Sequence, residues 1–111
     1  MTPNFNSRLG LEPGPEEDSV VLNAGEEHLV APGTVHFAVL ATLAEVAAAR
    51  VVSAAVVPAS LQLQLMRRAA PGRLVGRGRL LKKGRRLATA EGEVYQDDRL
   101  VAKASVTFAL V

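Results

Sequence analysis

The chain contains no cysteine and only two histidines, His28 and His36. The missing cysteines exclude disulfides, thiolate metal sites and a cysteine nucleophile, and two histidines make a multi-histidine metal site unexpected. Tryptophan is also absent, and the aromatic residues together make up 4% of the chain. Few rings are therefore available for stacking on nucleic-acid bases. We expect neither a metal nor a bound cofactor.

The composition predicts one globular domain that spans residues 1–111. Hydrophobic residues make up 49% of the chain and charged residues 22%, a balance typical of folded soluble proteins. The chain opens on polar and then acidic residues, unlike the basic and then apolar pattern of a secretory leader. Its most apolar run is too short to cross a bilayer. We therefore expect a cytoplasmic protein with no membrane partner.

Charge is distributed unevenly along the sequence although the net charge is only +2. Residues 1–49 hold seven acids and one base, Arg8, whereas residues 67–86 hold nine bases and no acid. A basic block of this kind attracts phosphate, either in nucleic acid or in a ligand that carries a nucleotide. The alternative is that its alternating arginines form the solvated face of a strand. Nucleic-acid binding is disfavoured by the shortage of aromatic residues, and steeply salt-dependent binding would be its sign.

The run GTVHFAVLATLAEVAAAR predicts a central helix over residues 33–51. Alanine and leucine favour helix, Thr34 is a candidate N-cap, and Arg50 suits the negative end of the helix dipole. A helix that is apolar on all sides is normally buried. Glu45 is its only ionisable residue between Phe37 and Ala49, and burial of an unpaired charge is costly. Three roles remain open for this carboxylate: catalysis, an ion pair, or ligand binding.

The remaining segments predict a short N-terminal element and an antiparallel sheet. Residues 1–17 predict a short helix and a loop rich in proline and acid, and residues 19–23 predict a first strand. Residues 56–110 predict four further strands, because apolar and polar side chains alternate along them. Short turn signals separate these strands: Pro71–Gly72, Lys83–Gly84–Arg85 and Asp97–Asp98–Arg99.

One architecture satisfies these elements. The sheet has a face of small apolar residues, and Gly76 and Gly78 on that face leave room for a bulky neighbour. The central helix is the only element available to cover it. We therefore expect an α+β fold in which a curved antiparallel sheet wraps one long central helix. The long edge strands favour association with a second copy.

The same pattern resembles the hotdog-fold acyl-CoA thioesterases, in particular the phenylacetate-degradation and 4-hydroxybenzoyl-CoA thioesterase groups. The family motif has a glycine, a His-Gly-Gly that begins three residues later, and a Leu-Ala-Asp/Glu whose acid follows the histidine by nine residues. Gly33, His36 and Glu45 fall at these spacings. The segments RRLATAEGEVY (85–95) and RLVAKASVTF (99–108) also resemble the family, and the resemblance covers roughly residues 18–110.

The resemblance implies a thioester hydrolase in which Glu45 acts as a nucleophile or as a base on water. It further implies that the Phe37 backbone amide polarises the thioester carbonyl, with His36 in a supporting role. Outside the resemblance, His36 is more simply explained as a residue that shapes the loop before the helix. Lys83, Arg85 and Arg86 are candidates for binding the phosphates of coenzyme A, which would enter as part of the substrate. The expected partners are an acyl-CoA or acyl-carrier thioester and further copies of the chain, as a dimer or tetramer.

The sequence departs from the family motif at four positions. Phe37 and Ala38 replace the two glycines, Val30 replaces an Asn or Gln, and Ala49 stands where one branch has Thr. The alternative function is therefore a non-catalytic hotdog protein that binds a ligand or assembles, having lost the glycine pair. An open space between Glu45 and Phe37 would favour the enzyme, and a filled one would favour the alternative.

Overall fold

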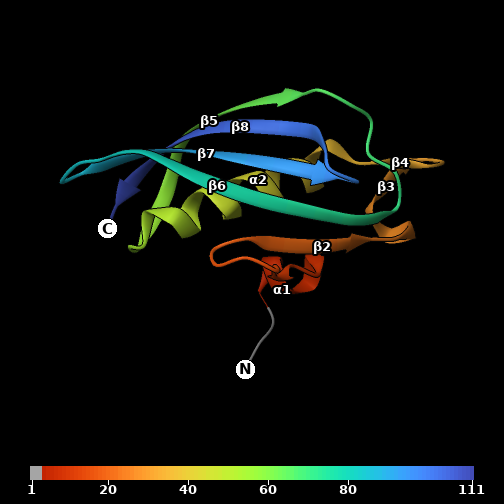
Figure 1. The fold of residues 1–111 in the computed structure, drawn as a ribbon. Coiled ribbons are helices and arrows are strands. Elements are labelled where there is room, and N and C mark those ends of the chain that lie inside the picture. The colour runs from red at the N-terminus through yellow and green to blue at the C-terminus, as the bar shows by residue number, and fades with distance from the viewer. Residues whose placement is uncertain (1–3) are drawn as a thin grey trace.

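The computed structural model describes residues 4–111. An antiparallel sheet curves around one helix, as predicted (Figure 1), but it has six strands rather than the expected five, because residues 12–13 of the predicted loop pair with residues 20–21. Its strand order is β1-β2-β6-β7-β8-β5, and β3 and β4 form a separate two-stranded hairpin. The elements are α1 (Phe5–Leu9), β1 (Glu12–Pro13), β2 (Val20–Ala24), a 3-10 turn (Glu26–His28), β3 (Leu29–Ala31), β4 (Thr34–Val35), α2 (Phe37–Val52), β5 (Val56–Leu65), β6 (Gly72–Lys83), β7 (Leu87–Gln96) and β8 (Arg99–Leu110). No helix among the described residues is long and apolar enough to cross a membrane.

The central helix begins at Phe37, four residues later than the sequence predicted. Residues 33–36 instead complete the β3–β4 hairpin, in which Leu29 pairs with Val35. The expected N-cap, Thr34, is therefore wrong: His36 caps the helix, and its Nδ1 accepts the Ala38 N–H at 3.0 Å. The local sequence favours both structures over this segment, and pairing with residues 29–31 decides between them.

Close helix–sheet packing depends on glycines in β6 and β7. Gly76 and Gly78 lie beneath Leu43 and Ala47 of α2, which confirms their predicted role. Gly92 in β7 lies against the backbone of Ala44, a contact that the sequence did not single out. The backbone of α2 therefore lies directly against the backbones of β6 and β7. Its buried face consists of Val39, Leu40, Leu43, Ala44, Ala47, Ala48 and Val52.

The sheet ends on one side at β5, which pairs only with β8. Leu61 and Leu65 lie opposite buried residues of β8, so they belong to the helix side of the sheet, yet they are 40% and 54% exposed. They remain uncovered because α2 lies mainly over β6 and β7. Pro58 lies at a bulge in this strand, a position that proline tolerates.

The hairpin between β7 and β8 has the two-residue turn predicted from Asp97 and Asp98. Gln96 pairs with Arg99 across it, and both aspartates have left-handed φ angles, 51° and 63°. This conformation strains residues other than glycine, and two-residue hairpins of this class prefer glycine at the second position.

Asp98→Gly should therefore stabilise the fold by about 0.5–1 kcal/mol, seen as a higher midpoint of urea unfolding. The control is Ser105→Gly, at an exposed position within β8, where glycine should destabilise the strand. A lower midpoint for Asp98→Gly would contradict the strain assigned to this turn.

The N-terminal segment is tied to the body by His28. Its buried ring accepts the Gly25 N–H at Nδ1, at 2.9 Å, and its Nε2 lies 2.8 Å from the Leu9 carbonyl oxygen. Leu9 and Leu11 pack against the core, whereas Phe5 is 66% exposed. His28 is thus a structural residue that links the loop before β3 to the end of α1.

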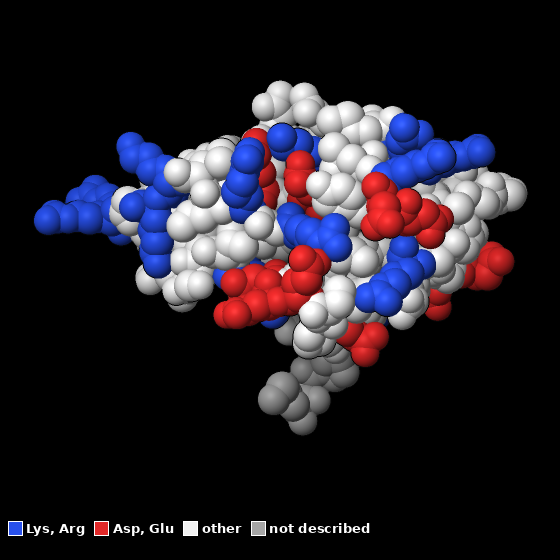
Figure 2. Space-filling model, viewed as in Figure 1, with Lys and Arg blue, Asp and Glu red and all other residues white. Residues whose placement is uncertain are grey.

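Many of the basic residues lie on the outer face of the sheet, where several are neutralised. Arg79 and Lys103 both pair with Glu91, and Arg77 pairs with Glu16 from the acidic N-terminal loop. Figure 2 shows acids and bases intermingled across the middle of the face in view, and bases without acids at the far left end. The solvated-strand interpretation is therefore correct for Arg77 and Arg79.

Candidate active site

Glu45 lies on the flank of α2 that is turned toward the open edge of the sheet. Leu43 packs on Gly76 of β6, and the next residue, Ala44, packs on Gly92 of β7. Each helical residue is rotated by about 100° from the residue before it. The rotation from Leu43 to Ala44 leads from β6 to β7, and the same sense of rotation leads on toward β8 and β5. Glu45 follows Ala44 in that direction and turns away from the sheet. The carboxylate therefore faces the side on which β5 leaves its leucines exposed.

The Glu45 carboxylate is half-buried and has no partner in the part of the chain that the structure describes. Neither a hydrogen bond nor a salt bridge joins its side chain to any residue between 4 and 111, so the ion pair allowed by the sequence is not formed within this part of the chain. Burial raises the pKa of Glu45 above its ordinary value of 4.5, and no neighbouring charge opposes this shift. A partly desolvated, unpaired carboxylate is a stronger base than an exposed one.

The start of α2 presents a free backbone donor. Among residues 4–111 the Phe37 N–H has no hydrogen-bond acceptor, whereas the adjacent Ala38 N–H is satisfied by His36. The His36 ring stacks on the Phe37 ring at a centroid distance of 4.9 Å. Because its Nδ1 is occupied as an acceptor, His36 is placed to orient this turn of the helix. The free N–H at a helix N-terminus is suited to a developing oxyanion.

Glu45 and the Phe37 amide lie at different levels of the same helix. They are separated by eight residues of continuous helix, which corresponds to about 12 Å along the axis. Within one chain the helix therefore holds these two groups about two turns apart.

The predicted phosphate-binding residues lie at the other end of the molecule. Lys83 donates to the Val52 carbonyl at 2.9 Å, at the C-terminal end of α2, and Arg85 and Arg86 follow in the exposed β6–β7 turn (Figure 1). The length of the helix places them about 24 Å from its N-terminus. Within one chain they are not brought together with the Phe37 amide.

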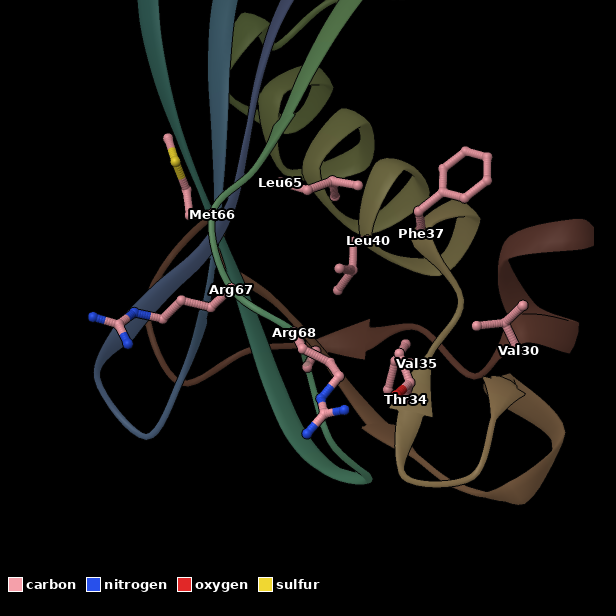
Figure 3. A pocket seen from close by; sticks show the side chains of 10 residues that line it. Val30, Thr34, Val35, Phe37, Leu40, Leu65, Met66, Arg67 and Arg68 are labelled. Atoms are coloured by element: carbon pink, nitrogen blue, oxygen red, sulfur yellow. The ribbon is translucent and has the colours of Figure 1, made fainter.

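An apolar hollow of about 370 Å³ adjoins the start of α2. Leu40 of the helix, Val35 of the β3–β4 hairpin and Leu65 of β5 face into it. Arg68 extends at its edge, and the Arg67 side chain points outward from the same edge (Figure 3). Both arginines belong to the basic block of the sequence, and nothing in that block indicated this hollow. The hollow unites three segments that are distant in the sequence, although an Arg pair directly after an apolar strand was a visible signal.

Comparison with known proteins identifies the family to which the fold belongs. Residues 19–109 match the sequence profile of the acyl-CoA thioesterase N-terminal domain. A conserved protein from Pseudomonas aeruginosa is 28% identical, with a TM-score of 0.90 over 100% of this chain and 96% of that one. A phenylacetic acid degradation-related protein from Ralstonia eutropha is also 28% identical, with a TM-score of 0.84 over 99% and 92% of the two chains.

A third similar structure is a mutant of the phenylacetic acid degradation protein PaaI from Thermus thermophilus. It is 27% identical, with a TM-score of 0.86 over 96% of this chain and 98% of that one. No curated protein matches the sequence. Because the family profile spans most of the chain, and a single helix packs against the antiparallel sheet as in these structures, the protein belongs to the hotdog-fold acyl-CoA thioesterase superfamily.

Proposed function

We propose that this protein hydrolyses an acyl-CoA or acyl-carrier thioester, with Glu45 as the catalytic carboxylate. The observation that supports the proposal most directly is the state of Glu45, which is half-buried, raised in pKa and unpaired within residues 4–111. A structural acid on a core helix normally has a cationic or hydrogen-bonding partner that offsets its desolvation. Glu45 has neither, and it lies in a chain whose family acts on thioesters.

In the proposed reaction a water molecule attacks the thioester carbonyl carbon while Glu45 accepts a proton from that water. The carbonyl oxygen takes up the electron pair and is stabilised by the Phe37 N–H. When the tetrahedral intermediate collapses, the C–S bond breaks and the proton held by Glu45 passes to the thiolate. Direct attack by Glu45, followed by hydrolysis of the resulting anhydride, uses the same two groups. Neither route requires a metal or a bound cofactor.

We propose that a second copy of the chain completes the site by pairing along β5. This ten-residue edge strand has no partner on its outer side among the described residues, and two of its helix-side leucines, Leu61 and Leu65, are exposed. A two-fold axis normal to the sheet would join two β5 strands antiparallel and reverse the second helix. The Phe37 N–H of one copy could then approach the Glu45 carboxylate of the other. The assembly would be a dimer, or a tetramer built from two such dimers.

Leu61→Lys should separate the copies, because a charge on the helix side of an edge strand opposes strand pairing. Light scattering should give a mass of at least twice 11.7 kDa for the wild type and close to 11.7 kDa for the variant. Thiol release should fall together with the mass. Ser105→Lys adds the same charge on an inner strand, at an exposed position, and should leave the dimer intact. A wild-type monomer with full activity would contradict the shared site.

The proposed activity is tested by measuring free-thiol release from short, medium and aromatic acyl-CoAs, with Glu45→Ala beside the wild type. Turnover by the wild type and its loss in the variant would support the proposal. If neither protein releases thiol from any member of the panel, the alternative of a non-catalytic hotdog protein is favoured. That alternative has one structural argument, namely that Phe37 and Ala38 replace the two glycines of the family motif.

A further inference from the structure

The apolar hollow beside the start of α2 has a cationic edge that the proposed reaction leaves unused. Its apolar lining consists of Val30, Val35, Phe37, Leu40, Leu65, Met66 and Ala69. Arg67 and Arg68 also border a second, polar hollow, which they share with Arg99 and with one acid, Asp97. Three cations and one carboxylate thus line this second hollow. The apolar hollow opens directly beside this positive surface.

The backbone that carries the two arginines is held on both sides. The Arg67 N–H donates to the Val101 carbonyl of β8 at 3.2 Å, and the Ala69 carbonyl accepts the Val35 N–H at 2.9 Å. The Gln96 side chain then bonds both the N–H and the carbonyl of Ala70, at 3.0 and 2.7 Å. The segment is therefore a fixed part of the hollow rather than a free surface loop.

The side chains of Arg67 and Arg68 are exposed, and their guanidinium groups remain without a partner. Neither forms a salt bridge or a side-chain hydrogen bond with any residue in the described part of the chain. This distinguishes them from Arg77 and Arg79, which are paired with Glu16 and Glu91 on the outer sheet face. A guanidinium presents several N–H donors in a fixed plane that matches carboxylate and phosphate oxygens.

We infer that this hollow binds the substrate through two contacts: an apolar group against its wall and an anionic group on Arg67 and Arg68. The inference rests on the proposed function, since Phe37 contributes both to the hollow and, through its N–H, to the proposed oxyanion site. The anion is either a carboxylate at the far end of the acyl group or a phosphate of the carrier. Both are oxyanions that charged hydrogen bonds from arginine recognise. The inference assigns the anion to Arg67 and Arg68 rather than to Lys83, Arg85 and Arg86.

The test measures binding rather than turnover, by calorimetric titration with four thioethers that cannot be hydrolysed. Two are coenzyme A thioethers that carry a butyl or a 3-carboxypropyl group. The other two carry the same groups on N-acetylcysteamine, which has no phosphate. The variants are Arg67→Gln/Arg68→Gln, the competing pair Arg85→Gln/Arg86→Gln, and the control pair Arg8→Gln/Arg50→Gln, which removes the same charge elsewhere on the surface.

The Arg67→Gln/Arg68→Gln variant should lose about tenfold or more in affinity for the anionic ligands, as expected when charged hydrogen bonds are removed. Loss for both carboxypropyl ligands alone would identify the carboxylate as the anion. Loss for both coenzyme A ligands alone would identify the phosphate. The control pair should change each affinity by less than about threefold, because unpaired surface charges contribute little at a distance. Circular dichroism and melting temperature would establish that each variant is folded.

Three outcomes overturn the inference. The first is that the Arg67→Gln/Arg68→Gln variant binds all four ligands with wild-type affinity. The second is that either other pair of substitutions lowers the affinity for the anionic ligands by the same factor. The third is that the wild type binds none of the ligands. A wild type that binds the thioethers but releases no thiol from the matching thioesters would separate the two proposals. That result would support the binding site at Arg67 and Arg68 and contradict the catalytic role of Glu45.

Discussion

Glu45→Gln should reduce the rate of thiol release by about a hundredfold or more, which is the typical loss when a general base is removed. Glutamine keeps the size and hydrogen-bonding shape of the side chain but cannot accept a proton from water or attack a carbonyl carbon. Since Glu45 has no partner among residues 4–111, no ion pair is broken by the change. The loss should therefore appear in kcat, with little change in the affinity for a thioether analogue.

The pH dependence of the wild type provides a second measurement on the same residue. Only the ionised carboxylate acts as a base, and burial raises its pKa above 4.5. The rate should therefore rise with pH through that raised pKa and level off above it. The residual activity of Glu45→Gln should lack this step. A wild-type rate that stays constant down to the ordinary glutamate range would contradict the base role.

Stability supplies the control for this substitution, and its sign follows from proton linkage. A carboxyl group whose folded pKa is raised stabilises the fold below its unfolded pKa, and this contribution is lost as pH rises through the folded pKa. At pH 8 the Glu45→Gln variant should therefore melt at the same temperature as the wild type or higher. The difference in melting temperature between the variant and the wild type should shrink as the pH falls toward 4.5. A variant that melts far below the wild type at pH 8 would indicate a structural role for Glu45.

Gly92→Ala should destabilise the protein by about 3 kcal/mol or more, the upper range for overpacking in a core. A Cβ at this position would overlap the carbonyl oxygen of Ala44 and lie 2.7 Å from its carbonyl carbon. Backbone atoms of α2 cannot move aside as a flexible side chain can. The helix would have to lift from β7, and lifting it would open contacts along the whole buried face.

The measurement is the free energy of unfolding in urea, with Gly25→Ala as the matched control. A Cβ at Gly25 would approach only the end of the flexible Glu27 side chain, so the expected change is below about 1 kcal/mol. Gly78→Ala should resemble Gly92→Ala, because its Cβ would overlap the Ala47 carbonyl. Equal stability of the Gly92→Ala and Gly25→Ala variants would show that α2 does not pack on β7 as closely as described.

The sequence by itself determined the main architecture. Alternation of apolar and polar residues after residue 56, short turns at Pro71 and Asp97, and one apolar helical run left a single helix to cover a single sheet face. These signals are local, because each depends on residues within a few positions of one another. The unusual position of Glu45 was visible for the same reason, as an isolated acid within an apolar run.

Only the tertiary structure decided which distant segments of the chain lie next to each other. It ended the hairpin at Val35 and began the helix at Phe37, and it joined Arg77 to Glu16 across more than sixty residues. It placed Lys83 at the C-terminal end of α2 and Arg68 beside its N-terminus, although both belong to one basic block of the sequence. β6 connects Arg68 to Lys83, so its direction along α2 places these two residues at opposite ends of the helix. That direction depends on the order of strands in the sheet, which is fixed by contacts between distant segments rather than by local pattern.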